Sequence, residues 1–261
     1  MTTPRAGCAV DTDGLITFQL PGAHGRRLLL RLRPKKGQPE KTLHVLDLNH
    51  GDEGRAHAVL GADPVLAEGR WDVFLLHGSE RTRLRPGPRD QRALVGGHLR
   101  ERHGPLAVRV PYVTKDGYLA VRAWLRPAHA EVDRIDVTDR SMTVDARLHG
   151  VPLREDASVE LRLRRGDGVL RTLKPLVGAD GRGFSFTVDH ETLDIGVWNV
   201  FVRPSPGAPL VRLARLLDDV ADRKEVFVYP SATAGDAVVR PYYTLDNDLS
   251  VEVTPQVVPV G

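Results

Sequence analysis

Cysteine is almost absent from this chain of 261 residues, where Cys8 is the only one. A single cysteine excludes an intramolecular disulfide and a zinc site built from several thiolates. No apolar run approaches the roughly 20 residues of a membrane-spanning helix. The first ten residues also lack the basic and apolar segments of an export signal. We therefore expect a protein of the reducing cytoplasm with no membrane span.

Signatures of the common nucleotide-using enzymes are missing as well. The chain has no P-loop, no dinucleotide-binding fingerprint and no G-x-S-x-G elbow. Aromatic residues are few, with three Trp, five Tyr and six Phe. Most of them occupy core-like strand positions, which leaves little for a platform that stacks on sugars or nucleic-acid bases. We expect no cofactor and no nucleic-acid partner, and the balance is against an enzyme.

The sequence is rich in short segments with alternating apolar residues, which are typical of half-buried strands. Clusters of Gly, Pro, Asp and Asn between them indicate turns, and helical signals are few. Residues 210–221 can form either a short helix or a strand and turn. The pattern predicts an all-β chain of antiparallel sandwiches of the immunoglobulin-like kind. The clearest strand segments are 15–20, 27–33, 71–76, 106–110, 118–124, 142–148, 159–163, 184–188, 198–202, 225–229 and 249–253.

An internal repeat divides the chain into two copies of one design. The motif Gly69-Arg70-Trp71-Asp72-Val73-Phe74 returns as Gly196-Val197-Trp198-Asn199-Val200-Phe201. The segment Pro111-Tyr112-Val113-Thr114 returns as Pro241-Tyr242-Tyr243-Thr244, in the same order along the chain and at nearly the same offset. We predict two tandem domains, 10–125 and 134–254, joined by a short linker at 126–133 and followed by a loosely ordered tail at 255–261.

Residues kept in both copies are candidates for what the module needs. A buried Trp on a central strand is the usual centre of a sandwich core, which favours a core position for Trp71 and Trp198 over a sugar-stacking role. Four further residues are candidates for ligand binding, because a guanidinium beside a phenol can hold a phosphate or a sugar hydroxyl. The alternatives are ion pairs for the arginines and a backbone-bonded corner for the tyrosines. These candidates are Arg109, Tyr112, Arg240 and Tyr242.

A histidine-rich segment, 44–57, has no counterpart in the second copy. His44, His50 and His57 are candidate metal ligands, although no H-E-x-x-H motif is present. His50 with Asp52 or Glu53 could also form a general-base pair, with His57 nearby in sequence. A glycine-bounded solvated loop is the structural alternative.

The basic stretch 81–92, interrupted by Pro86-Gly87-Pro88, suits either an anionic polymer or a solvated loop. No aromatic residue interleaves with its arginines, which favours the loop.

The Trp-x-Val-Phe strand, the later Arg-Leu pair (Arg83-Leu84 and Arg212-Leu213) and the Pro-Tyr-x-Thr segment resemble the C-terminal β-sandwich modules of bacterial teichoic-acid-type glycosyltransferases and glycerophosphotransferases. The resemblance spans about residues 10–254. It implies immunoglobulin-like modules that mediate oligomerisation or hold polymer, whereas catalysis in that family belongs to a separate N-terminal domain. This sequence contains no such domain.

Two function hypotheses follow. The first is a non-catalytic binding or scaffolding protein associated with biosynthesis of cell-wall polymer, another glycan or a secondary metabolite. Its expected partners are another protein or a second copy of the chain, and an anionic or glycosyl polymer. The alternative is a small biosynthetic enzyme with a site in the cleft between the domains, near the 44–57 segment.

Overall fold

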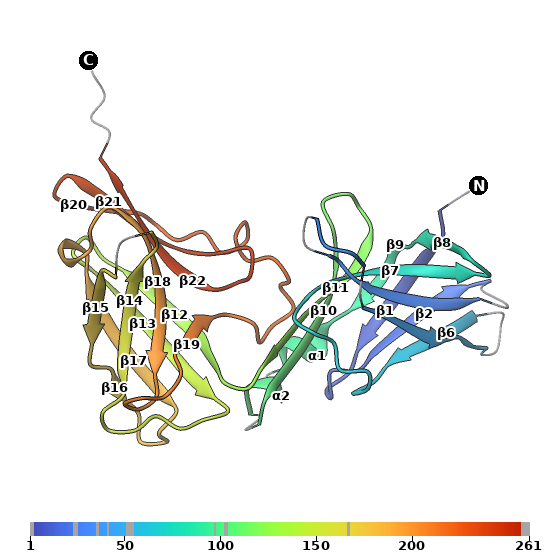
Figure 1. The fold of residues 1–261 in the computed structure, drawn as a ribbon, viewed down its shortest axis with the longest axis horizontal. Helices are drawn as coiled ribbons and strands as arrows, with labels where there is room; N and C mark the ends of the chain where they lie inside the picture. The colour runs from blue at the N-terminus through green and yellow to red at the C-terminus, as the bar shows by residue number, and fades with distance from the viewer. Residues whose placement is uncertain are drawn as a thin grey trace, which may run out of the picture. The chain divides into compact units, whose positions relative to one another are not determined.

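The computed structural model describes residues 3–22, 26–34, 37–40, 42–50, 55–96, 98–101, 104–165 and 168–256. The chain is all-β, as predicted, with strands arranged in several sheets (Figure 1). It divides into two compact units. Unit 1 comprises Met1–Arg102, Ala107–Leu125 and Leu217–Ala221, and unit 2 comprises His103–Leu106, Arg126–Leu216 and Asp222–Gly261.

Unit 1 contains two sheets. The first has the order β5 (Asn49–His50), β6 (Arg55–Leu60), β2 (Ile16–Pro21), β1 (Arg5–Val10) and β9 (Arg85–Asp90). The second has the order β10 (Leu106–Val113), β11 (Leu119–Arg126), β7 (Gly69–His77), β3 (Arg27–Leu32) and β4 (Leu43–Asp47), and β8 (Glu80–Arg83) also pairs with β7.

Unit 2 is one connected set of strands. Its path runs β16 (Leu176–Val177), β17 (Gly183–Asp189), β13 (Ser141–His149), β12 (His129–Val137), β19 (Val211–Ala214), β18 (Gly196–Arg203), β22 (Leu249–Pro255), β21 (Ala237–Tyr243) and β20 (Ala232–Ala234). Off this path, β14 (Ser158–Leu163) pairs with both β18 and β15 (Leu170–Leu173).

The strand neighbours correspond between the units. Strand β7 pairs with β3, β8 and β11, and β18 pairs with β14, β19 and β22. Strand β2 lies between β6 and β1, as β13 lies between β17 and β12. In unit 1, β8 joins one sheet and β9 the other. In unit 2, β19 alone pairs antiparallel with β18 and parallel with β12.

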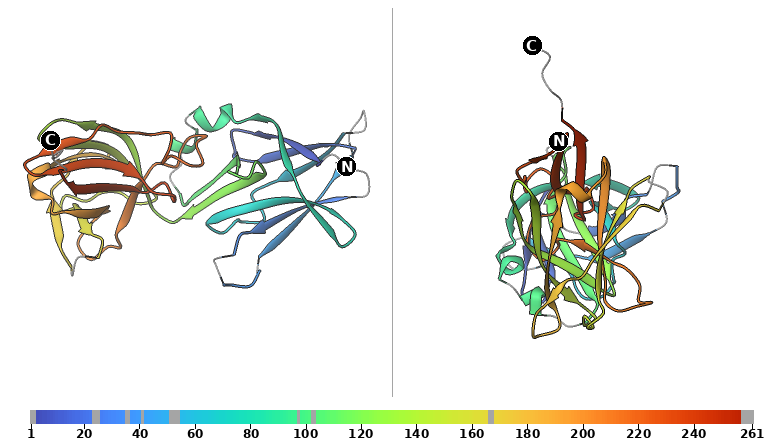
Figure 2. Two further views of the ribbon diagram at one scale, coloured as in Figure 1. Left: turned by 90° about the horizontal axis from the view of Figure 1, so that it is seen from above. Right: turned by 90° about the vertical axis from the view of Figure 1, so that its left-hand side faces the viewer.

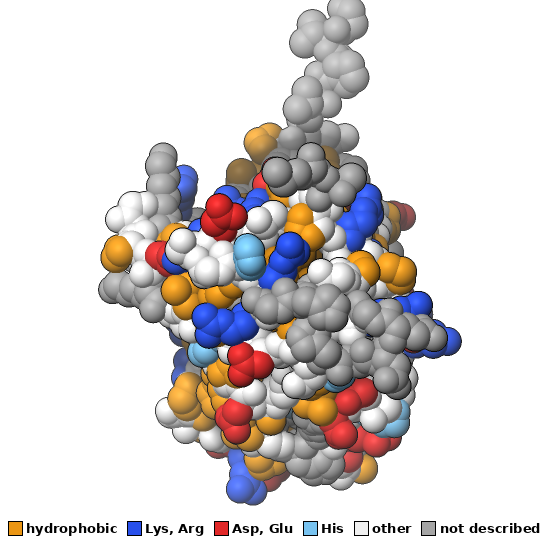
Figure 3. Space-filling view, turned by 90° about the vertical axis from the view of Figure 1, so that its right-hand side faces the viewer, with side chains coloured by type: hydrophobic (Ala, Val, Ile, Leu, Met, Phe, Trp, Pro, Cys, Tyr) orange, Lys and Arg blue, Asp and Glu red, His pale blue; other side chains and the backbone are white. Residues whose placement is uncertain are grey.

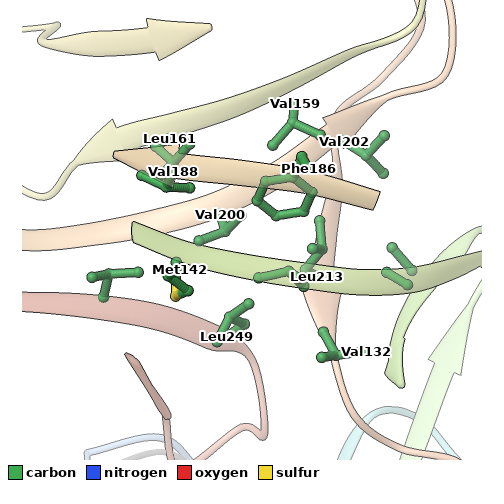
Figure 4. Packing of buried hydrophobic residues seen from close by; sticks show 14 of the residues in the cluster. Val132, Met142, Val159, Leu161, Phe186, Val188, Val200, Val202, Leu213 and Leu249 are labelled. Atoms are coloured by element: carbon green, nitrogen blue, oxygen red, sulfur yellow. The ribbon is translucent and has the colours of Figure 1, made fainter. Parts of the chain in front are cut away.

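The core of unit 2 is filled by inward side chains from both groups of strands, because alternate residues of a strand point to one face. Figure 4 shows Met142 and Phe186 from β13 and β17 packed with Val200 and Leu249 from β18 and β22. The indole of Trp198 is completely buried in this core. Trp71 is completely buried in unit 1.

Strands extend into the segments predicted as linker and tail, and the predicted domain boundaries stay predictions. Strand β11 ends at Arg126 and β12 begins at His129, so only Pro127 and Ala128 separate two strands where a linker at 126–133 was expected. The predicted tail starts inside β22, which ends at Pro255, and residues 257–261 lie outside the described part of the chain.

Two ambiguous segments resolve as strands. Residues 211–214 form β19, which settles the choice between helix and strand at the start of 210–221. The basic stretch 81–92 is largely β8 and β9 rather than a loop. The short helices α1 (Arg92–Val95) and α2 (His98–Glu101) follow it (Figure 2).

Candidate functional site

The repeated tryptophans make the same structural contact in both units. Trp71 Nε1 donates to the carbonyl of Ala67 at 3.0 Å, and Trp198 Nε1 donates to that of Asp194 at 2.9 Å. Each acceptor lies four residues before its indole. A buried indole N–H that already has a backbone partner has no donor left for a ligand.

The residue after each Trp is the centre of an arginine cluster. Asp72 accepts from Arg31, Arg70 and Arg83 at 2.8–3.4 Å. Its counterpart Asn199 accepts from Arg164 at 2.8 Å and from Arg212 at 2.7 Å. The side chain of Asp72 is 4% exposed, so these guanidiniums satisfy a buried carboxylate.

The repeated arginines of these clusters reach different partners. The guanidinium of Arg83 lies 4.0 Å from the ring centre of Tyr118, a cation–π contact. Arg212 instead forms an ion pair with Asp248, at 3.3 Å. Tyr118 and Asp248 are separated by the same offset as the two copies of the Pro-Tyr segment. One structural position is therefore filled by an aromatic ring in unit 1 and by a carboxylate in unit 2.

The four candidate ligand residues are divided between the units, two in each. The two arginines among them make contacts inside their own unit. Arg109 donates to the carbonyls of Gly61 and Gly14, which ties β10 to the end of β6 and to the turn between β1 and β2. Arg240 pairs with Glu252, its neighbour across β21 and β22, at 2.8 Å. Tyr112 and Tyr242 are half-buried strand residues.

The histidine-rich segment is divided between the two sheets of unit 1. His44 lies on β4, and its ring stacks on the core indole of Trp71 with 5.1 Å between ring centres. His57 lies on β6, directly across from Gln19 of β2. Asp52 and Glu53 lie outside the described residues, as does the side chain of His50. Within the described ranges, no group of three or more His, Cys, Asp or Glu side chains is placed to hold a metal ion.

Cys8 is buried on β1, and burial raises the pKa of its thiol to about 11, against a smaller lowering by the charge of Arg89. A thiol with this pKa is protonated at neutral pH. Since the thiolate is the reactive form, Cys8 has the chemistry of a core residue.

A groove of about 350 Å³ opens on the first sheet of unit 1, between β9, β1, β2 and β6. Arg5, Gln19 and Arg55 are exposed side chains at its rim. A cavity of this size suits a small ligand or one residue of a polymer. The complete lining is Arg5, Gly7, Gln19, Leu20, Pro21, Arg55, Gly87 and Pro88.

A β-bulge creates this groove. Ala6 of β1 pairs with Pro86 of β9, but Cys8 pairs with Arg89, so Gly87 and Pro88 together stand opposite Gly7. A Cβ on Gly87 would lie 2.8 Å from the Gly7 nitrogen, which only glycine avoids. Bulges at sheet edges often accompany binding and active sites.

Positive charge is concentrated locally at the groove. Two of its described lining residues are arginines and none is acidic. The guanidinium of Arg5 donates from Nη1 to the carbonyl of Pro86 at 2.9 Å, which holds it over the bulge. On the face of the molecule in Figure 3, basic side chains are interspersed with acidic and apolar ones.

Sequence reasoning found only parts of this site. The basic stretch 81–92 contains Gly87 and Pro88, and the histidine segment contains His57, which neighbours Gln19. Arg5, Gly7 and Gln19 gave no signal, because one unremarkable residue from each of several strands forms the groove. Gly7 and Gly87 indicate a groove only when the register of β1 and β9 is known, because that register places them opposite each other.

Comparisons with known proteins add little. No protein-family model matches the chain, and no curated protein matches it. Among solved structures it is similar to the crystal structure of residues 217–571 of TarS from S. aureus, with 15% sequence identity and a TM-score of 0.31. The match covers 74% of this chain and 57% of that one, and a likeness this low carries no argument about function. No described helix is long and apolar enough to cross a membrane.

Proposed function

We propose that this chain is a non-catalytic binding and scaffolding protein made of two tandem immunoglobulin-like β-sandwiches, with its ligand surface at the groove of unit 1. The observation that carries the proposal is the bulged groove itself, which has two guanidiniums and a carboxamide at its rim. The motif resemblance supports a role beside cytoplasmic biosynthesis of a cell-wall polymer or another glycan.

The contacts of the repeated residues support binding over catalysis. The indoles bond to backbone carbonyls, and Asp72 is surrounded by three arginines. Arg109 ties down the turn between β1 and β2, and Arg240 forms a cross-strand pair. A general base or nucleophile needs a reactive side chain directed at a substrate. The shared residues are instead engaged in holding each unit together.

A polymer-retention experiment tests the proposal. The full chain would be passed over immobilised poly(glycerol phosphate) and over dextran, and its mass would be measured by light scattering with and without soluble polymer. We expect retention on at least one polymer, or self-association, and recovery of the polymer chemically unchanged by NMR. A monomeric chain that neither polymer retains would overturn the proposal. Shortened or modified polymer would replace it with the enzymatic alternative.

A further inference from the structure

At the bulge of the groove, the two units carry different residues at equivalent strand positions. Gly7 of β1 pairs with Gln19 of β2, and Glu131 of β12 pairs with Arg147 of β13. Gln19 and Arg147 are separated by the same offset that relates Leu20 to Leu148 in the repeat. By its pairing with β13, Glu131 in unit 2 corresponds to Gly7 in unit 1. Two positions earlier in these strands, His129 corresponds to Arg5.

In unit 2 this position holds a buried carboxylate. Glu131 Oε2 accepts from the backbone N–H of Leu216 at 2.7 Å and lies 2.8 Å from His129 Nε2. The ring of His149 stacks on that of His129, with 6.1 Å between ring centres. Glu131 is 1% exposed and both histidines are 2% exposed or less. A carboxylate is tolerated at such depth only when donors surround it.

In unit 1 the same position has donors but no side chain. Gly7 contributes no side chain here, although a Cβ at this position would lie 3.2 Å from the Pro88 carbonyl oxygen, and Arg5 replaces His129 with a guanidinium. Gln19 and Arg55 add further N–H groups at the rim. The described lining of the groove thus offers N–H donors but no carboxylate, whereas unit 2 places a carboxylate of its own chain at this position.

We propose that the groove of unit 1 binds an oxyanion, a phosphate or a carboxylate carried by a small molecule or a polymer unit, where unit 2 places the Glu131 carboxylate. Arg5 is its principal ligand, and Gln19 and Arg55 complete the rim. This inference rests on the proposed function and specifies what the groove recognises. His57 faces the same side of the sheet as its strand partner Gln19, although it is not one of the groove's lining residues.

Titration of the full chain, followed by amide NMR shifts, tests the inference with three probes: glycerol 3-phosphate, glucuronate and glucose. We expect one or both anions to shift residues of β1, β2 and β9 in a saturable way, and glucose to shift none of them. The two anions separate a phosphate-specific site from a carboxylate site. Binding should weaken with added salt because the attraction is between charges.

Two variants challenge the geometry. Arg5→Gln should weaken binding at least about tenfold, because a hydrogen bond to a charged group contributes about that factor or more. Gly7→Glu should abolish binding by supplying an internal carboxylate as unit 2 does. A Cβ at Gly7 would lie 3.2 Å from the Pro88 carbonyl, so Gln19→Leu provides a second, milder block. Arg81→Gln is the matched control, since Arg81 lies on β8 of the other sheet and pairs with Glu40.

The inference is overturned if Arg5→Gln binds both anions as tightly as the unchanged chain does, or if Arg81→Gln loses as much affinity. It also fails if glucose binds the groove as well as the anions do. Glucose binding of this strength would contradict the oxyanion inference but leave the proposed binding function intact. Failure of the polymer experiment together with the loss of all three small probes would remove both proposals.

Discussion

His190 is a buried histidine in the 3₁₀ turn His190–Thr192 of unit 2. Burial lowers the pKa of its imidazole below the ordinary 6.5, against an opposing effect of the Asp189 charge. The folded state therefore prefers the neutral ring more strongly than the unfolded chain does. The stability linked to this preference is fully present above pH 6.5 and is lost as the pH falls through the lower folded pKa.

The corresponding prediction is that unit 2 loses unfolding free energy between pH 7.5 and pH 5, and that His190→Gln loses less over the same range. Urea titrations at several pH values, followed by tryptophan fluorescence, would measure both slopes. His77→Gln is the control, because His77 is exposed at the end of β7 and has no burial to relieve. Identical pH slopes for His190→Gln and the unchanged chain would contradict the assignment.

At the scale of elements, each of the two strands that contain the repeated Trp, β7 and β18, begins with a glycine in an unusual backbone conformation. Gly69 has a φ of 149° and Gly196 a φ of 137°, a region that side chains with a Cβ rarely adopt. A Cβ at these positions would lie 2.8 Å from Leu32 Cδ1 and 2.7 Å from Leu163 Cδ1, respectively. Leu32 pairs with Trp71 across neighbouring strands, and Leu163 pairs with Trp198 in the same way.

We therefore predict that Gly196→Ala destabilises unit 2 by about 1–3 kcal/mol, the usual cost of a strained backbone position. Denaturant unfolding would measure the change, and Gly69→Ala should act similarly in unit 1. Gly104→Ala is the control, since a Cβ there meets no atom within 4 Å. Equal stability of Gly196→Ala and Gly104→Ala would show that neither the strain nor the leucine contact matters.

Most of the predicted strands are present because alternation and turn residues are local signals, but the strand predicted at 225–229 was wrong, since these residues form no strand. Residues 71–76 and 198–202 lie within β7 and β18, and the glycine of each motif begins its strand. Register is not local, since it depends on which strand lies alongside. That is why the sequence showed Arg109 and Arg240 as repeated residues but could not show their contacts with Gly61 and Glu252. For the same reason, the pairing that places Gly7 opposite Gly87 and Pro88 was hidden.

At the scale of the whole molecule, the units share strand neighbours and differ in polar side chains. Tyr118 and Asp248 fill one shared position, and Gly7 and Glu131 fill another. Burial lowers the pKa of Arg212 and raises the pKa of Asp248, so this ion pair carries a desolvation cost that the ring of Tyr118 avoids. A shared topology thus accommodates different chemistry at equivalent positions, while the indole and its backbone hydrogen bond are kept in both.

Because each unit has its own completely buried Trp, we predict that Trp71→Ala and Trp198→Ala affect separate parts of the chain. Each should cost about 3–5 kcal/mol in its own unit, the usual loss for truncating a buried aromatic side chain. Hydrogen exchange measured by mass spectrometry would resolve the effect by segment. Trp71→Ala should deprotect β7 and its neighbours β3 and β11, and Trp198→Ala should deprotect β18, β14 and β22. Loss of protection across both sets of strands in either variant would contradict two independent cores and would mean that the chain unfolds as one cooperative body.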